Sequence, residues 1–204
     1  MSDLSTAASL DGEAAAALAG RPGPGTASRR GPGGPGSAVG LDIGGTKVLA
    51  AFLGSDGVAR ETLRLPTVRG PEGVVSSAAR AVREVVRRAC GDLADVDGVG
   101  VGVPGLVDPA DGSVVHAVNL GIEGGRFALA EALSAELGGV PVQVDNDLNV
   151  AALGASHLRG AEGEDLAFLA LGTGLAAGIV LGGELRRGVS GAAGEIGHIP
   201  IDPR

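Results

Sequence analysis

The chain has 204 residues, including 38 glycines and 11 prolines, and a formal net charge of −8. The acidic balance disfavours a nucleic-acid-binding surface, and no apolar run is long enough to predict a membrane-spanning helix. A single cysteine, Cys90, leaves no internal disulfide, and the N-terminus lacks the features of a secretory signal, so we expect a cytoplasmic protein with one domain of ordinary size or parts of two.

Residues 1–38 differ in composition from the rest of the chain. Residues 4–19 are rich in alanine and predict at most a weak helix, and residues 21–37 are mostly Gly, Pro and Arg. Such a segment buries too little apolar surface to offset the entropy lost on ordering, so we expect a disordered tail. A start of translation nearer Val39 is the alternative. A DNA-binding helix-turn-helix is not expected, because no second helix is predicted there.

The most informative stretch is residues 41–47, where apolar runs on both sides predict two strands joined by a glycine turn. Because glycine has no Cβ, a phosphate can approach the main-chain N–H groups of such a turn, while Thr46 adds a hydroxyl and Lys47 a charge. Asp42 interrupts an apolar strand, where a carboxylate is costly unless it is paired or holds a metal. We therefore expect a Mg²⁺ site there, direct or through water. An ordinary hairpin turn is the alternative.

Strands and helices alternate beyond this turn, which indicates an α/β protein. We expect strands over residues 58–65, 96–103, 114–118 and 140–144, and helices over residues 71–90 and 127–137. The strand over residues 96–103 runs into a Gly/Pro turn over residues 102–108. In α/β folds the carboxyl ends of strands face the ligand crevice, so this turn is a candidate part of the site.

Asp145, Asn146 and Asp147 follow the last of these strands and precede another predicted helix. One Asp or Asn suffices to cap a helix, and three in a row exceed that need. A carboxylate at a helix N-terminus is kept ionised by the dipole, which suits a base that accepts a proton from a hydroxyl attacking phosphorus. Helix capping alone is the alternative.

An internal repeat follows. Residues 169–174 echo residues 41–46, and residues 176–181 echo residues 48–53. A repeat at so large a separation indicates a duplicated domain. Two lobes that each offer a glycine turn to one cleft could hold a polyphosphate from both sides.

The order of these motifs resembles the ROK (repressor, open reading frame, kinase) family of sugar kinases, from Val39 to the C-terminus. The matching segments are residues 42–47, 102–105, 119–120, 146–147, 171–174 and 194–198. The resemblance implies the α/β, actin-like (ribonuclease H-like) ATPase fold. It places a complete first lobe over residues 39–144 and the start of a second, partial lobe over residues 145–204.

The resemblance also implies a reaction, the transfer of the γ-phosphoryl group of Mg-ATP to a hexose, usually the 6-hydroxyl of glucose. Asp147 would be the catalytic base. The sugar would be bound by Asn119, Asn146, Asp147, Glu195 and His198. The phosphates would be bound by Gly44, Gly45, Thr46, Lys47, Gly172, Thr173 and Gly174, with Asp42 near Mg²⁺. The implied partners are a hexose and ATP, without nucleic acid or membrane, and a homodimer is left open.

Two features depart from the family pattern. The second glycine turn continues with Ala176 and Ala177, where many members have more glycines. His198 would ligate a structural zinc, but the chain stops at Arg204, before the family's Cys-x-Cys-Gly-x-x-Gly-Cys-x-Glu motif, so the zinc site is incomplete. We therefore expect little phosphorylation of glucose by the chain alone. The alternatives are a sugar-binding ROK regulator without its DNA-binding domain and an inactive fragment.

Overall fold

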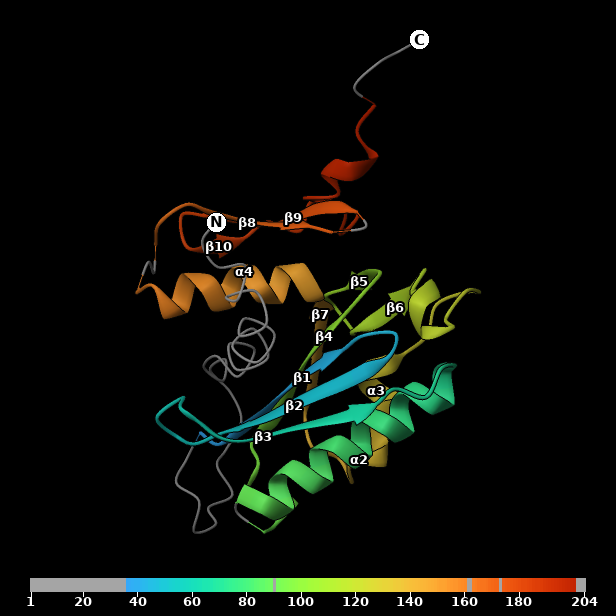
Figure 1. Cartoon of the computed structure of the whole chain (residues 1–204), viewed down its shortest axis with the longest axis vertical. Helices are drawn as coiled ribbons and strands as arrows, with labels where there is room; N and C mark the ends of the chain where they lie inside the picture. The colour runs from blue at the N-terminus through green and yellow to red at the C-terminus, as the bar shows by residue number, and fades with distance from the viewer. Residues whose placement is uncertain (1–35, 90, 161–162, 173, 201–204) are drawn as a thin grey trace, which may run out of the picture.

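The computed structural model describes residues 36–89, 91–160, 163–172 and 174–200. Nearly all of the expected N-terminal tail lies outside these residues, as do Cys90 and Thr173. A five-stranded sheet has the order β3-β2-β1-β4-β7 (Figure 1). Its strands are β1 (Ala38–Ile43), β2 (Lys47–Leu53), β3 (Ala59–Pro66), β4 (Gly98–Val103) and β7 (Val142–Asn146).

The central strand β1 joins two kinds of pairing. It is antiparallel to β2 and parallel to β4, and β4 is parallel to β7. Asp42 pairs with Gly102, and Gly102 pairs in turn with Asp145. The carboxyl ends of the three parallel strands therefore meet at one edge of the sheet, which is where α/β folds bind their ligands.

Two helices, α2 (Pro71–Ala89) and α3 (Leu129–Glu136), cover one face of this sheet (Figure 1). The buried residues of α2 include Val74, Ala78, Val82 and Val85, which confirms the helical spacing predicted from the sequence. They pack against Leu41 and the other side chains of a core built almost entirely of Val, Leu, Ile and Ala.

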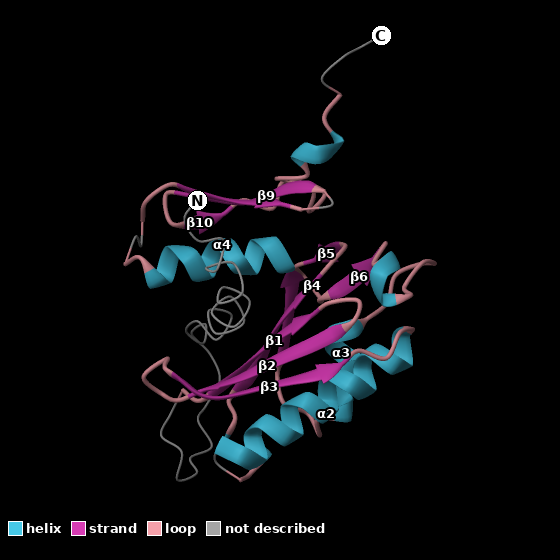
Figure 2. Cartoon of the chain, in the orientation of Figure 1, coloured by secondary structure: helices cyan, strands magenta, loops and turns pink. Residues whose placement is uncertain are grey.

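Helix α4 (Asp147–Leu158) lies between the first sheet and a second sheet, which has the order β10-β9-β8 (Figure 2). The strands of the second sheet are β8 (Leu166–Leu171), β9 (Leu175–Leu181) and β10 (Glu184–Leu185). Small residues let α4 approach β9 closely, because a Cβ on Gly178 would lie 2.1 Å from the Leu148 carbonyl oxygen. The outer face of the second sheet exposes large apolar side chains, among them Leu169 and Leu171.

The expected repeat is present as two antiparallel hairpins, β1–β2 and β8–β9. The hairpins differ by one residue in their turns, because Ile43 pairs with Val48 whereas Leu171 pairs with Leu175. In the described part of the chain, no helix is long and apolar enough to cross a membrane.

Residues 104–122 differ most from the sequence prediction. The expected turn over residues 102–108 contains a strand, β5 (Leu106–Asp108), which forms a hairpin with β6 (Ser113–Val115). The strand expected over residues 114–118 ends at Val115, and a 3₁₀ turn, η3 (Val118–Leu120), follows it. Two further 3₁₀ turns are η2 (Leu93–Asp95) and η4 (Ile196–His198). Gly105 and Gly112, at φ 102° and 66°, supply the backbone angles that make the hairpin possible.

Candidate functional site

Asp147 and Asp42 lie at the carboxyl edge of the first sheet, and the charge of Glu195 acts on Asp147 from the segment before η4. Asp147 is the first residue of α4 and directly follows β7. Burial raises the pKa of its carboxyl to about 6, and the negative charges of Asp42 and Glu195 add to the rise. A hydrogen bond from the Leu148 amide, 2.9 Å from Oδ1, opposes it. Asp147 is therefore a weaker acid than its helix-terminal position predicts, because burial outweighs the amide, yet it is mostly ionised at neutral pH.

This raised pKa predicts a pH-dependent gain in stability on replacing Asp147 by asparagine. In the folded chain the carboxyl resists ionisation, so its contribution is fully present below the ordinary pKa of 3.8 and is lost as pH rises through about 6. Asparagine keeps the shape and never ionises. Without added metal, we expect Asp147→Asn to stabilise the 204-residue chain by about 1–3 kcal/mol at pH 7.5 and hardly at pH 4, measured by urea unfolding.

Asp111 provides a control of opposite sign. Its hydrogen bond with Arg126 lowers the pKa of its carboxyl to about 2. Stability from that interaction is present above the ordinary pKa and is lost as pH falls, so Asp111→Asn should destabilise the chain at pH 7.5. A gain from Asp147→Asn that is equal at both pH values would show that burial does not oppose the charge of Asp147.

Asn146 accounts for the helix cap. Its Oδ1 accepts hydrogen bonds from the amides of Leu148 at 3.0 Å and Asn149 at 3.4 Å. Its Nδ2 donates to the Gly105 carbonyl at 3.1 Å, which ties the start of α4 to the turn after β4. Capping alone therefore explains one of the three consecutive polar residues and leaves Asp145 and Asp147 for other roles.

The first glycine turn packs against the segment that contains Asn119. The Thr67 hydroxyl donates to the Gly44 carbonyl at 2.7 Å, and the Thr67 amide donates to the Thr46 carbonyl at 3.1 Å. A Cβ on Gly45 would lie 2.8 Å from the Asn119 carbonyl oxygen. The structure thus brings the turn and Asn119 together, and glycine at position 45 is required by this contact.

The second glycine turn connects β8 and β9 in the other sheet. The Gly172 amide donates to the Gly174 carbonyl at 2.9 Å, and both residues are exposed. The two glycine turns are alike in that each joins the strands of an antiparallel hairpin. Thr173, the counterpart of Thr46, lies outside the described residues.

Glu195 and His198 lie at the two ends of η4, with 3.9 Å between His198 Nε2 and Glu195 Oε2. The His198 side chain is 87% exposed. Among the described residues, no group of three or more His, Cys, Asp and Glu could hold a metal. The described residues therefore do not fit a structural zinc. Mg²⁺ needs one or two carboxylates besides phosphate and water oxygens, and the partly buried Asp42 at the strand end fits that requirement.

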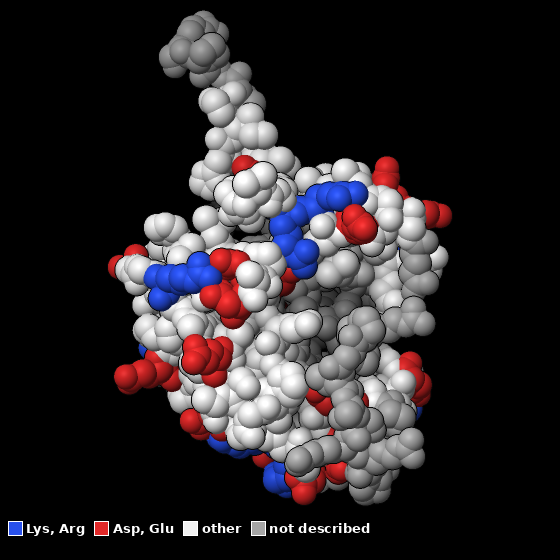
Figure 3. Space-filling view, turned by 180° about the vertical axis from the view of Figure 1, so that it is seen from behind, with Lys and Arg blue, Asp and Glu red and all other residues white. Residues whose placement is uncertain are grey.

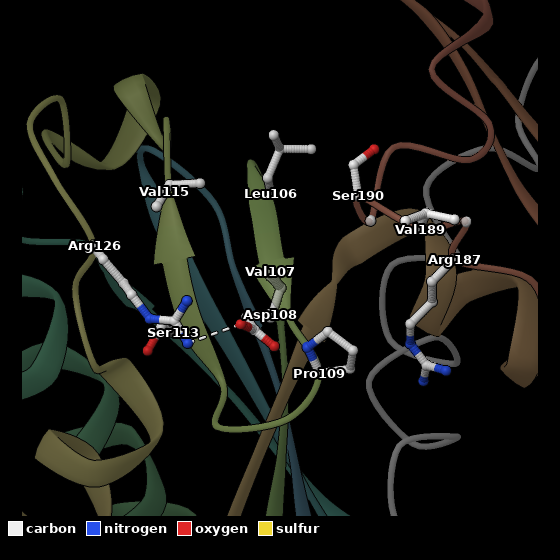
Figure 4. Close-up of a pocket in the computed structure, with 12 residues that line it drawn as sticks. Leu106, Val107, Asp108, Pro109, Ser113, Val115, Arg126, Arg187, Val189 and Ser190 are labelled. Carbon is white, nitrogen blue, oxygen red and sulfur yellow. Dashed lines mark hydrogen bonds and ion pairs between the residues drawn. The ribbon is translucent and has the colours of Figure 1, made fainter.

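A pocket of about 310 Å³ lies beside this edge, between the β5–β6 hairpin and the loop over residues 187–191. Figure 4 shows Arg126 and Arg187 on opposite sides of Asp108 and Pro109. None of the residues proposed to bind sugar or phosphate lines this pocket. On the described part of the face shown in Figure 3, acidic and basic side chains are scattered and do not form a continuous basic patch.

Two residues of this region escaped the sequence analysis. Thr67 fixes the first glycine turn from 23 residues away, and Arg187 forms an ion pair with Asp145 from 42 residues away. Neither stands in a motif, and only the paired arginines within a glycine-rich loop could have drawn attention to Arg187.

Known proteins are similar to this chain over about four fifths of its length. The sequence model of the ROK family matches residues 38–204. A glucokinase of Halalkalibacterium halodurans is 37% identical over 168 residues, which cover 81% of this chain and 50% of the relative. A putative xylose repressor of a Caldicellulosiruptor species is 32% identical over 171 residues, which cover 82% of this chain and 42% of the relative.

A solved structure is similar over the same region. The crystal structure of a ROK family glucokinase from Streptomyces griseus, in complex with glucose and AMPPNP, matches with a TM-score of 0.71 and 36% identity. The match covers 82% of this chain and 52% of that chain. The chain thus spans about half the length of the glucokinases that it matches.

Proposed function

The chain belongs to the ROK family and has its actin-like α/β fold. We propose that it contributes the catalytic base of an ATP-dependent hexose kinase. The acceptor would be the 6-hydroxyl of glucose. One observation supports this proposal above the others. Asp147 lies where the carboxyl ends of three parallel strands meet, and burial, with the charges of Asp42 and Glu195, raises its pKa to about 6. A general base works best with a pKa near the working pH.

The proposed roles follow from the chemistry of each group. Asp147 would accept the proton of the sugar hydroxyl as that oxygen attacks the γ-phosphorus of ATP. Amide, carboxylate and imidazole side chains would hold the remaining sugar hydroxyls, and these are Asn119, Asn146, Glu195 and His198. Fixed partners on several hydroxyls would set the distance and angle of attack, which supplies much of the rate in phosphoryl transfer.

The glycine turns would hold the phosphates. In the first turn, the Gly44 amide donates to the Lys47 carbonyl at 2.9 Å, so Gly44 would contribute space for the phosphate and not a hydrogen bond. Gly45, Thr46 and Lys47 would supply the donors, and residues 172–174 would face the nucleotide from the second sheet. Mg²⁺, held by Asp42 together with phosphate oxygens, would neutralise charge on the transferred group.

We propose that the chain is divided into two lobes. Residues 39–144 would form the first lobe and residues 145–204 the start of the second. The exposed apolar face of β8 and β9 would then pack against the remainder of a second lobe like that of the longer relatives. A reaction that uses ATP and a free hexose would take place in the cytoplasm.

A sugar-binding regulator is the second candidate, because a putative xylose repressor is among the similar proteins. Both candidates predict sugar binding, and only the kinase predicts transfer of phosphate. The two can be separated with a hybrid in which residues 38–204 replace the region that they match in the Streptomyces griseus glucokinase, which supplies the other half.

Sugar binding can be tested first on the 204-residue chain. We expect saturable glucose binding, and we expect Gly45→Ala to weaken it about tenfold or more, because the new Cβ would displace Asn119. Gly44→Ala is the matched control, since its Cβ would lie 3.6 Å from the nearest atom, the Lys47 carbonyl oxygen. The chain has no Trp or Tyr, so calorimetry or ligand-observed NMR is the suitable measurement. Equal glucose affinity in the two variants would remove Asn119 from the sugar site.

A further inference from the structure

Asp145 is a buried carboxylate that the proposed reaction does not use. The residue is 8% exposed, and each carboxylate oxygen accepts two hydrogen bonds. Oδ1 accepts from the Asn146 amide and from Asn149 Nδ2, both at 2.8 Å. Oδ2 accepts from Nε and Nη2 of Arg187, at 2.9 and 2.6 Å. A carboxylate this enclosed is tolerated as an anion only with partners of this kind.

Arg187 is the second residue of the loop that leads from β10 to Glu195. The Ala193 amide donates to the Arg187 carbonyl at 3.0 Å and closes the loop upon itself. The Ala177 amide donates to the Gly194 carbonyl at 2.8 Å and fixes the far end of the loop to β9. The Arg187 side chain leaves this loop beside Pro109 (Figure 4) and reaches the end of β7. One ion pair thus joins a loop of the second sheet to the catalytic edge of the first.

We propose that Asp145 and Arg187 are a positioning pair, which holds the loop that carries Glu195 opposite the strand end that carries Asn146 and Asp147. The inference rests on the proposed function, because it concerns the distance between sugar-binding groups from the two sheets. Neither residue needs to touch the sugar. Two of the three guanidinium nitrogens, Nε and Nη2, donate to the same carboxylate oxygen, so the pair restrains direction as well as distance. A displacement of about 1 Å in such a site can cost up to about a hundredfold.

The test uses single and double substitutions in the 204-residue chain. We expect Arg187→Gln and Asp145→Asn each to weaken glucose binding about tenfold or more. The double variant should be no weaker than the weaker single variant, because both substitutions remove the same interaction. Arg187→Lys should restore part of the affinity, since it keeps the charge and loses the planar fork. Arg186→Gln is the matched control, because the exposed Arg186 side chain pairs with Glu184 and donates to the Leu181 carbonyl, both within the β9–β10 region.

A second readout reports on the loop itself. In Arg187→Gln, the amides of residues 192–198 should exchange with deuterium faster than in the unaltered chain, while those of β7 stay protected. A residue with a merely structural role would lower the unfolding midpoint and leave the affinity of folded molecules unchanged. Glucose affinity is therefore measured well below that midpoint.

The outcomes separate this inference from the proposed function. Folded Arg187→Gln that binds glucose like the unaltered chain, or that shows unchanged exchange over residues 192–198, would overturn the positioning role. Failure of the unaltered chain to bind any hexose would instead overturn the proposed function, and the exchange result would then decide alone whether the pair anchors the loop.

Discussion

Replacing Asp147 by asparagine in the hybrid is expected to lower kcat for glucose phosphorylation about a thousandfold or more, with little change in glucose affinity. Asparagine retains the Oδ1 acceptor for the Leu148 amide, so the start of α4 stays in place. It cannot accept the proton of the attacking hydroxyl, and loss of a general base typically costs about a hundredfold to ten-thousandfold. A thousandfold loss corresponds to about 4 kcal/mol in the activation barrier.

The control for this substitution is Asp165→Asn. Asp165 lies before β8 and accepts a hydrogen bond from the Gly182 amide at 2.7 Å, away from the strand edge that carries Asp147. Its substitution should leave kcat within about twofold, a change in barrier below about 0.5 kcal/mol. If kcat for Asp147→Asn stays within about tenfold of the value for the unaltered hybrid, Asp147 is not the base. A tenfold change corresponds to about 1.4 kcal/mol in the activation barrier.

Replacing Gly178 by alanine is expected to cause a large loss of stability. The added Cβ would lie 2.1 Å from the Leu148 carbonyl oxygen and 2.6 Å from the Ala152 Cβ. Both belong to α4, so the helix and β9 would have to separate. Overpacking typically costs about 1–3 kcal/mol, and a backbone clash this close should cost at least about 3. For a chain of this size that predicts a Tm lower by about 6–12 °C.

Circular dichroism of the 204-residue chain measures this effect directly. Gly124→Ala is the matched control, because a Cβ at Gly124 would meet no atom within 4 Å. Its Tm should stay within about 1–2 °C of the unaltered value. An equal Tm for Gly178→Ala and Gly124→Ala would contradict the close packing of α4 on β9, and with it the placement of Asp147 by that helix.

Local patterns predicted the parts of the fold that neighbouring residues determine. The apolar runs on both sides of residues 44–46 predicted the β1–β2 hairpin, and the helical spacing from Val74 to Val85 predicted the buried face of α2. The order of six short motifs also predicted the family, which the comparisons confirm. The start of the parallel strand β7 was placed two residues early, because its limits depend on pairing with β4.

Local sequence patterns could not predict contacts between segments that are far apart in the chain. Asp145, Asn146 and Asp147 look equivalent in the sequence. In the structure, Asp145 pairs with Arg187, Asn146 caps α4, and the carboxyl of Asp147 has a raised pKa. Those differences depend on burial and on the loop after β10. Likewise, the β5–β6 hairpin depends on backbone angles at Gly105 and Gly112, which the sequence shows only as two glycines among 38.

Phosphoryl transfer by the hybrid that contains residues 38–204 distinguishes the kinase from the regulator. Purified hybrid would be incubated with Mg-ATP and glucose, and the product followed by phosphorus NMR, with the intact Streptomyces griseus enzyme as reference. We predict that the hybrid forms glucose 6-phosphate and that the Asp147→Asn hybrid does not. A folded hybrid that binds glucose and ATP and yet forms no sugar phosphate would contradict it, and would favour the sugar-binding regulator.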